Sequence, residues 1–261
     1  MKRHAHRHSC EVALRRPLAF GVTLTVVWWG LIVVLSYTLP RLSPHSFPSL
    51  GSTIINLILF AVVVTLVIRC GWRGPVGLGA PHPDRNWLFL VPLLVGALSF
   101  AARGLVGTPT QFMSSAVLFL ALGLNEELLY RGVIQHATDR LGAVRSVVSV
   151  ALLFGLGHFG NAVFFGQPLF ETVAQVISAT AFGLAYSAVR LHLMTIWPLA
   201  VLHGLEDFCN TRSLGTTPSW WYAVIAAYYA GYAAWLLIQM SRREGSVRPG
   251  AGEAGAHRRP G

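Results

Sequence analysis

Charged residues are scarce in this chain of 261 residues. They make up 11% of the chain and hydrophobic residues 54%, whereas about a quarter of an average soluble domain is charged. The mean hydropathy is +0.56. A chain with so few charges cannot cover a soluble surface, so we expect lipid to solvate most of it.

Cysteine and lysine are also rare. The three cysteines, Cys10, Cys70 and Cys209, are far apart and form no C-x-x-C pair. This spacing predicts neither a zinc-thiolate site nor a disulfide framework. Lys2 is the one lysine, and nineteen arginines bring the net charge to +10. On a soluble protein this charge would suggest nucleic acid, but here the basic residues fall mostly in tails and short loops. The pattern therefore favours a membrane protein with no nucleic-acid partner.

Long apolar segments follow one another along the chain and are separated by loops that contain Pro and Gly. They predict an all-α, polytopic helix bundle with about eight transmembrane helices. The first segment resembles a signal peptide, but it is long and lacks a small-x-small cleavage site, so we interpret it as an uncleaved span. We expect a basic tail (1–17), one membrane domain (18–240) and a disordered tail (241–261). The expected spans are Leu18–Leu39, Ile54–Ile68, Trp87–Ala102, Ser115–Ala137, Arg145–Phe159, Phe170–Val189, Thr195–Phe208 and Trp220–Met240.

The distribution of basic residues predicts the orientation. With a cytoplasmic N-terminus and Arg131 set aside because it lies inside a span, sixteen Lys and Arg residues fall in inner segments. Three, Arg41, Arg103 and Arg212, fall in outer loops. Cytoplasmic loops carry the excess of basic residues in membrane proteins. We therefore expect a multi-pass protein of the plasma membrane with both termini in the cytoplasm.

Five polar residues interrupt the apolar segments: Glu126, Glu127, Arg131, His158 and His203. A charged side chain in a bilayer core costs roughly 2.5 to 3.5 kcal/mol on insertion scales. Residues kept at that cost usually have a chemical use, so this set marks the candidate site.

Helical spacing assigns different partners to the two glutamates. Glu127 and Arg131 are four residues apart, with the acid first, which is the favourable order for an ion pair. Glu126 points about 100° away from Glu127 and is left free. His203 and Asp207 are again four residues apart, so Asp207 can fix the histidine ring.

Glu126, His158 and His203 lie at similar depths, roughly 12 to 20 Å from the inner ends of their helices at 1.5 Å per residue. Three helices can therefore bring them to one level in the bundle. A desolvated carboxylate can act as general base toward water while the histidines orient it. Alternatively, Glu126, His158 and His203 form a zinc ligand set with an open fourth position. Either arrangement favours hydrolysis of peptide bonds at the membrane.

Three motifs in this order resemble those of the CPBP (CAAX protease and bacteriocin-processing, or Abi) family of intramembrane proteases. E-E-L-L-Y-R at Glu126–Arg131 is similar to the family's E-E-x-x-x-R motif. F-G-L-G-H-F-G-N at Phe154–Asn161 is similar to F-x-x-x-H with a following Asn. H-G-L-E-D at His203–Asp207 is similar to H-x-x-x-[N/D]. The resemblance covers about Ser115–Phe208.

The resemblance implies an eight-span bundle and a glutamate-dependent or metal-assisted endopeptidase whose water-filled cavity opens toward the cytosol. Glu126 would activate water, and Glu127 and Arg131 would shape the site. His158 and His203 would orient water or stabilise the oxyanion, and Asn161 and Asp207 would support them. The cofactor is then none or zinc. Asp207 departs from the Asn of eukaryotic members, and its added negative charge favours metal binding.

The substrate implied by the resemblance is a membrane-associated peptide or protein. The Arg-rich, Lys-poor composition favours a bacterial source, which argues against a prenylated substrate. An alternative is a non-catalytic immunity or scaffold protein with the same fold. A proton-coupled transporter ranks last, because the sequence contains no clear repeat.

Overall fold

The computed structural model describes residues 10, 14–39, 44–80 and 85–246, with the backbone alone for Arg85 and residues 243–246. Helices make up nearly all of its regular structure, and one isolated bridge joins Leu105 to Ser213. The tails expected at 1–17 and 241–261 lie largely outside these residues, although the last helix continues to Ser246.

The α-helices are α2 (Pro17–Thr38), α3 (Leu50–Cys70), α4 (Val91–Ser99), α5 (Pro109–Glu127), α6 (Gln135–Thr138), α7 (Ala143–Gly157), α8 (Phe159–Phe165), α9 (Leu169–Arg190), α10 (Trp197–Arg212) and α11 (Ser219–Ser246). The 3-10 helices are η1 (Arg85–Leu90) and η3 (Asp139–Leu141), and η2 (Leu128–Ile134) is a π-helix.

Local sequence signals set the helix ends. At the start of α5, the Thr108 side chain accepts a hydrogen bond from the Gln111 amide, and the Gln111 side chain accepts one from the Thr108 amide. Pro109 follows at the first helical position, so the capping box and the proline together fix where α5 begins. At the C-terminal end of α3, Gly71 adopts the left-handed conformation with φ of 73°, which ends that helix.

Six helical segments among the described residues are long and apolar enough to cross a membrane, so the chain is a multi-pass membrane protein. The expected count of eight is not confirmed. Two of the eight expected spans fall on shorter helices: Trp87–Ala102 on η1 and α4, and Thr195–Phe208 on α10, which has 16 residues. The six are Pro17–Thr38, Leu50–Cys70, Pro109–Leu141, Ala143–Phe165, Leu169–Arg190 and Ser219–Arg242.

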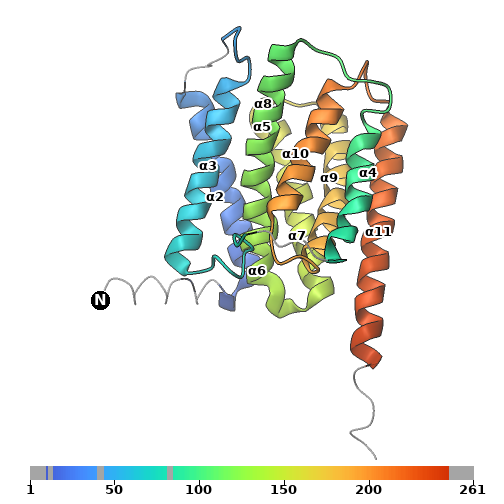
Figure 1. The fold of residues 1–261 in the computed structure, drawn as a ribbon. Coiled ribbons are helices and arrows are strands. Elements are labelled where there is room, and N and C mark those ends of the chain that lie inside the picture. Colours follow the sequence, from blue (N-terminus) through green and yellow to red (C-terminus); the bar gives the residue numbers. More distant parts are fainter. Residues whose placement is uncertain (1–9, 11–13, 40–43, 81–84, 247–261) are drawn as a thin grey trace, which may run out of the picture.

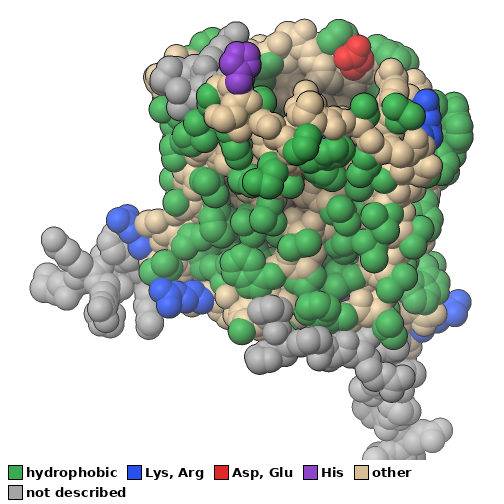
Figure 2. Space-filling model, turned by 45° about the horizontal axis from the view of Figure 1, so that its top comes forward, with side chains coloured by type: hydrophobic (Ala, Val, Ile, Leu, Met, Phe, Trp, Pro, Cys, Tyr) green, Lys and Arg blue, Asp and Glu red, His purple; other side chains and the backbone are tan. Residues whose placement is uncertain are grey.

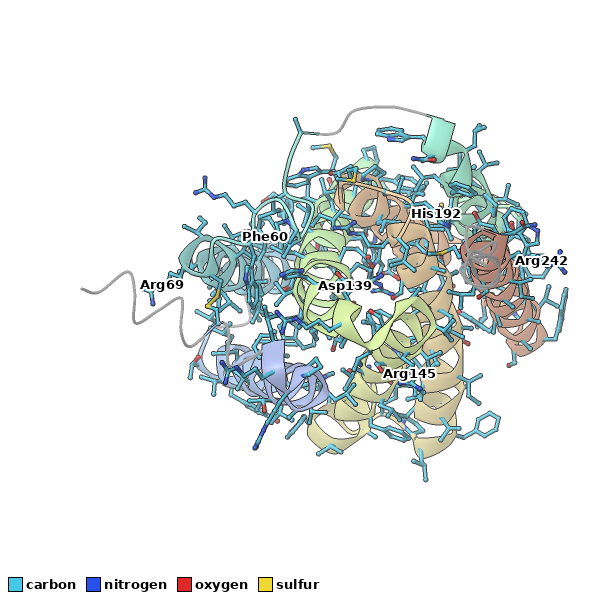
Figure 3. The ribbon with its side chains drawn as sticks, turned by 90° about the horizontal axis from the view of Figure 1, so that it is seen from below. Phe60, Arg69, Asp139, Arg145, His192 and Arg242 are labelled. Atoms are coloured by element: carbon cyan, nitrogen blue, oxygen red, sulfur yellow. A yellow bond between two sulfur atoms is a disulfide. The ribbon has the colours of Figure 1, made fainter. Side chains whose placement is uncertain are left out.

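The helices pack as one bundle in which α2 begins and α11 ends at the same face, the lower one in Figure 1. Lys and Arg side chains lie mostly along the lower rim in Figure 2, and apolar side chains cover the flanks. Seen from below in Figure 3, the lower face carries Arg69, Arg145 and Arg242. We call it the basic face.

A disulfide joins Cys10 to Cys70 at the basic face. The sequence analysis predicted no disulfide framework and did not anticipate this single pair. The two residues are 60 positions apart, but α2 and α3 run in opposite directions and return the chain to the same face. Cys209 is a free, buried cysteine. Sequence spacing alone could not show that the first two meet.

Candidate active site

The first motif lies where α5 gives way to the π-helix η2. Glu126 and Glu127 end α5, and Arg131 lies in η2. π-helical turns are rare and often occur at functional sites. Arg131 Nη1 donates to Glu127 Oε1 over 2.9 Å, and both side chains are fully buried. The ion pair expected from the spacing is therefore present.

Aromatic rings surround the Arg131 guanidinium on its other sides. The Cζ atom of the guanidinium lies 4.3 Å from the ring centroid of Phe154, 5.4 Å from that of Phe182 and 5.6 Å from that of Tyr186. Such faces attract a cation, and more strongly where water is excluded. Within the described part of the chain, Arg131 Nε and Nη2 have no hydrogen-bond partner. One carboxylate and three rings thus hold this buried charge.

Two glycines let α10 approach α5 closely enough to complete the site. A Cβ at Gly123 would lie 2.3 Å from the carbonyl oxygen of Ala200, and one at Gly204 would lie 2.6 Å from that of Phe119. Any larger residue would collide with the backbone of the facing helix. Gly204 follows His203 in the third motif, so the motif contains both the functional side chain and the small residue that brings it to α5.

His203 is the centre of the polar network. Its Nδ1 lies 2.8 Å from Glu127 Oε1. Its Nε2 lies 3.8 Å from Glu126 Oε2 and 3.7 Å from Asp207 Oδ2. The sequence pointed to Asp207 as the acid that fixes this ring, but the ring nitrogen Nδ1 donates its hydrogen bond to Glu127, 76 positions earlier. Asp207 instead faces the other nitrogen together with Glu126.

His158 and Asn161 lie across the pocket from His203. His158 Nδ1 is 2.9 Å from the carbonyl oxygen of Phe154, one turn earlier. Because a carbonyl only accepts, Nδ1 carries the hydrogen and Nε2 is left as the second polar atom of the ring. Asn161 Nδ2 donates to Gln175 Oε1 over 3.0 Å. The second motif therefore supplies a separately anchored group of polar side chains.

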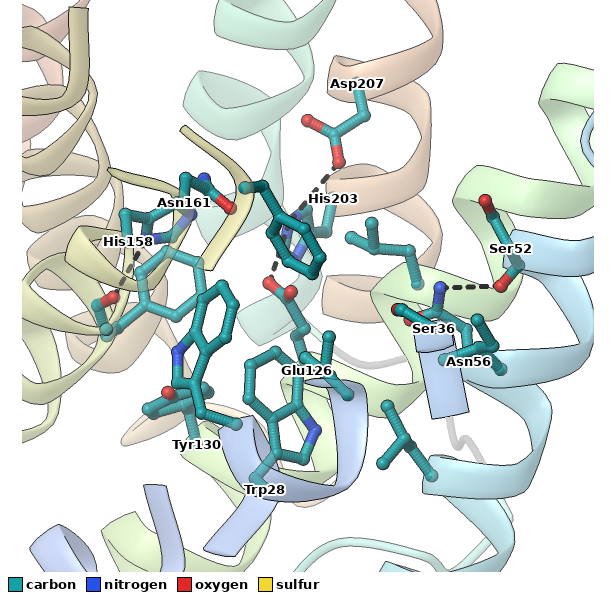
Figure 4. A pocket seen from close by; sticks show the side chains of 18 of the residues that line it. Trp28, Ser36, Ser52, Asn56, Glu126, Tyr130, His158, Asn161, His203 and Asp207 are labelled. Carbon is teal, nitrogen blue, oxygen red and sulfur yellow. Dashed lines mark hydrogen bonds and ion pairs between the residues drawn. The ribbon is translucent and has the colours of Figure 1, made fainter. Parts of the chain in front are cut away.

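Both groups face one pocket with a volume of about 490 Å³. Figure 4 shows Glu126, His203 and Asp207 on one side of it and His158 and Asn161 on the other. Aromatic and aliphatic side chains of α2, α3 and α5 form the remaining walls. The pocket is lined by Trp28, Trp29, Ile32, Ser36, Ser52, Ile55, Asn56, Leu59, Leu118, Leu122, Glu126, Tyr130, Phe154, Gly157, His158, Asn161, Phe165, Gln175, His203 and Asp207.

The pocket lies in the half of the bundle away from the basic face. On α2 its lining begins at Trp28 and reaches Ser36 near the far end, and on α3 it includes Ser52 at the start. In α9, Gln175 lies near the start, also far from the basic face. The resemblance implied a cavity open toward the cytosol. If the basic face is cytoplasmic, the pocket instead lies toward the opposite side of the membrane.

The zinc ligand set that the sequence left open as an alternative was Glu126, His158 and His203. Among the described residues, no three His, Cys, Asp or Glu side chains are grouped so that they could hold one ion. Glu126 and Asp207 face the same nitrogen of His203, while His158 is anchored to its own helix. The arrangement of donors therefore does not fit a three-ligand metal site.

Other residues in or beside the pocket were missed by the sequence analysis. Asn125 is fully buried beside Glu126, and it links Trp28 to Asn56 through two hydrogen bonds. Tyr130 is a variable position inside the first motif, and its ring packs edge-on against Phe154. A polar Asn directly before the two glutamates was a signal that could have drawn attention. Gln175 carried none, because a single Gln near a helix start is ordinary.

Comparison with known proteins supports the resemblance. Residues 108–209 match the model of the Rce1-like family, described as type II CAAX prenyl endopeptidase Rce1-like. The matched range contains all three motifs, so the family suggested by the motifs is confirmed over this region. The chain matches no curated protein.

Proposed function

We propose that this protein is an integral membrane endopeptidase in which Glu126 activates the attacking water. The family match supports a CAAX protease-like membrane enzyme with peptide or protein substrates. The observation that carries the mechanism is the difference in contacts between the two glutamates. Glu127 is committed to Arg131 and His203. Glu126 lines the pocket, and its ion-pair partner among the described residues, His203, is 3.8 Å away.

In the proposed reaction, Glu126 removes a proton from water as the water oxygen attacks the scissile carbonyl carbon. The carbonyl π electrons move to oxygen and form an oxyanion. Glu126 then delivers the proton to the leaving amine as the C–N bond breaks. A correctly placed general base contributes about 100- to 10,000-fold to such a reaction.

His203 is the proposed oxyanion donor. Glu127 holds its Nδ1 and so directs Nε2 toward the pocket side. A protonated Nε2 would donate to the developing negative charge, which is a strong contribution where water is excluded. His158, with Nδ1 bound to Phe154, would orient the water or the substrate through Nε2. Asn161 and Asp207 would support the two histidines.

We infer a metal-free mechanism, because the donors of the described residues do not converge on one ion position. In the alternative, zinc held by Glu126, His158 and His203 would polarise the water and the carbonyl. That arrangement requires His158 and Glu126 to come together, and the two lie on opposite sides of the pocket (Figure 4). Chelation, described in the Discussion, separates the two mechanisms.

We propose that the basic face lies in the cytoplasm of a bacterial plasma membrane, with both termini on that side. The argument is the excess of sixteen Lys and Arg residues over three. The substrate is then a membrane-associated peptide or protein that reaches the pocket from the bilayer or from the side opposite the basic face. A scaffold or immunity protein is not favoured, since all three motifs are intact and share one pocket.

The test is cleavage of a peptide library by purified protein, with products identified by mass spectrometry. We expect wild type to cleave and Glu126→Gln to lose at least about 100-fold in turnover. The variant should keep normal yield and thermal stability, because Gln preserves the size of the side chain and the buried ion pair belongs to Glu127. Substantial turnover by Glu126→Gln would remove Glu126 as the base. No cleavage by wild type would overturn the proposed function.

A further inference from the structure

A chain of hydrogen bonds through Asn125, which is buried, and Asn56, which is half-buried, joins three helices beside Glu126. Trp28 Nε1 on α2 donates to Asn125 Oδ1 on α5 over 3.2 Å. Asn125 Nδ2 donates to Asn56 Oδ1 on α3 over 3.1 Å, and Asn56 Nδ2 donates to the carbonyl of Ser52 over 3.0 Å. Each bond fixes the next group, so the indole of Trp28 is held indirectly by α3.

This chain of hydrogen bonds is favourable only when every buried polar group in it has a partner. Asn125 is fully buried, and a buried amide left without partners is penalised by about 1 to 3 kcal/mol. Both polar atoms of its side chain are used here. Asn125 therefore specifies one position of α2 and α3 relative to α5, next to the residue proposed as the base.

The side chain that these hydrogen bonds position, Trp28, lines the pocket. Trp28 is 7% exposed and lies below Glu126 in Figure 4, between Tyr130 and Asn56. Its ring packs edge-on against Tyr130, with ring centroids 6.4 Å apart. The neighbouring lining is aliphatic, contributed by Ile32, Ile55, Leu59, Leu118 and Leu122.

We propose that Trp28 is a specificity-determining residue, the floor of an apolar subsite that binds an uncharged side chain next to the scissile bond. Asn125 and Asn56 are its positioning residues. The inference rests on the proposed function, since it assigns a substrate subsite to the same pocket. A fixed indole gives a rigid apolar surface at little cost in side-chain entropy, and the Asn125 bond satisfies its N–H.

The neighbouring residue provides a matched control. Trp29 is also a tryptophan of α2 that lines the pocket. Within the described part of the chain its Nε1 is buried without a hydrogen-bond partner. Replacing Trp with Phe removes an N–H at both positions, but only at position 28 does it remove a bond to Asn125.

The experiment compares Trp28→Phe, Asn125→Leu, the double variant and Trp29→Phe on the best-cleaved peptide of the library, with an apolar residue beside the cleaved bond. We expect Trp28→Phe and Asn125→Leu each to raise KM about three- to tenfold and to leave kcat within about twofold. The double variant should raise KM no more than the single variant with the larger effect, because both substitutions remove the same bond. Trp29→Phe also removes ring area from the pocket wall but no bond to Asn125, so it should raise KM less than Trp28→Phe does.

The outcomes separate this inference from the proposed function. If wild type cleaves and Glu126→Gln does not, but Trp28→Phe behaves like Trp29→Phe, the subsite is wrong and the proposed function stands. Effects confined to thermal stability or kcat, with KM unchanged, would likewise reduce Asn125 to a packing role. If wild type cleaves no peptide, both proposals fall. Trp28→Phe also keeps the test valid if Asn125→Leu does not fold.

Discussion

The surroundings of Glu126 and Glu127 differ sharply, although the two residues are adjacent in the chain. The Glu127 side chain is fully buried and bonds to Arg131 at 2.9 Å and to His203 at 2.8 Å. The Glu126 side chain is 12% exposed and faces the pocket, with His203 Nε2 at 3.8 Å. Two identical side chains on consecutive residues thus have different surroundings. We call the buried surroundings of Glu127 the closed region and the pocket side occupied by Glu126 the open region.

The comparison shows how one helix separates structure from chemistry. A turn of about 100° per residue directs Glu127 into the interface with α10 and Glu126 toward the pocket. A buried charge is tolerated only when it is paired and hydrogen-bonded, which Glu127 achieves with Arg131 and His203. A carboxylate that lines a cavity and lacks such close ion pairs and hydrogen bonds is available to accept and deliver a proton. The predictions below test this division.

The largest effect on stability is expected in the closed region. Removing either Glu127 or Arg131 leaves the other charge buried and unpaired, so each change to Ala should cost about 3 to 5 kcal/mol. The double change should cost less than the sum of the two. Thermal unfolding in detergent measures all three variants. Additive losses would show that the pair is not an energetic unit.

A smaller loss is expected from filling the contact between α5 and α10. In Gly204→Ala the new Cβ would lie 2.6 Å from the Phe119 carbonyl, and overpacking of this kind costs about 1 to 3 kcal/mol. The shift of α10 should also lower turnover, since His203 precedes Gly204. Gly231→Ala on α11 is the control, because a Cβ at that position would meet no described atom within 4 Å. Equal stability of the two variants would contradict the close approach.

The open region should tolerate a change at Asp207 if no metal is used. Asp207 Oδ2 lies 3.7 Å from His203 Nε2, too far for a direct hydrogen bond. We therefore expect Asp207→Asn to stay within a fewfold of wild-type turnover and chelators to have no effect. A zinc enzyme would behave differently: Asp207→Ala would weaken metal affinity about 10- to 100-fold. Loss of activity on chelation, with recovery on adding zinc, would overturn the metal-free mechanism.

The smallest effect is expected at the basic face, far from both glutamates. The proposed orientation puts Cys10 and Cys70 in the cytoplasm, where disulfides are rare, although the two sulfurs are bonded in the structure. We therefore expect both thiols to react with a membrane-permeant maleimide in intact cells and to pair only after oxidation. Cys10→Ser should then change stability by less than about 0.5 kcal/mol under reducing conditions.

The control for orientation is a tag at each terminus, which should be accessible only from the cytoplasm. A disulfide trapped directly from cells, together with tags accessible from outside, would reverse the orientation. The pocket would then lie in the cytoplasmic half, as the family resemblance implied.

Local information in the sequence was enough for several features. Apolar segments identified a helical membrane protein, and the six long helices follow those segments. The Glu127–Arg131 ion pair followed from a separation of four residues. The match over residues 108–209 confirmed the family suggested by the three motifs. The count of eight spans was not confirmed, because hydropathy does not show how far a short apolar helix reaches.

The sequence by itself determined which segments are helical and which side chains within one turn can pair, since both depend on a helical period of 3.6 residues. Only the tertiary structure decided the contacts between distant residues. His203 bonds to Glu127 across 76 positions, Trp28 to Asn125 across 97, and Cys10 to Cys70 across 60. These contacts depend on which helix faces rest against one another, and that is set by packing such as the close approach at Gly123 and Gly204. The periodicity of a single helix carries no information about its partner, so the pocket and the different environments of the two glutamates became visible only in the folded bundle.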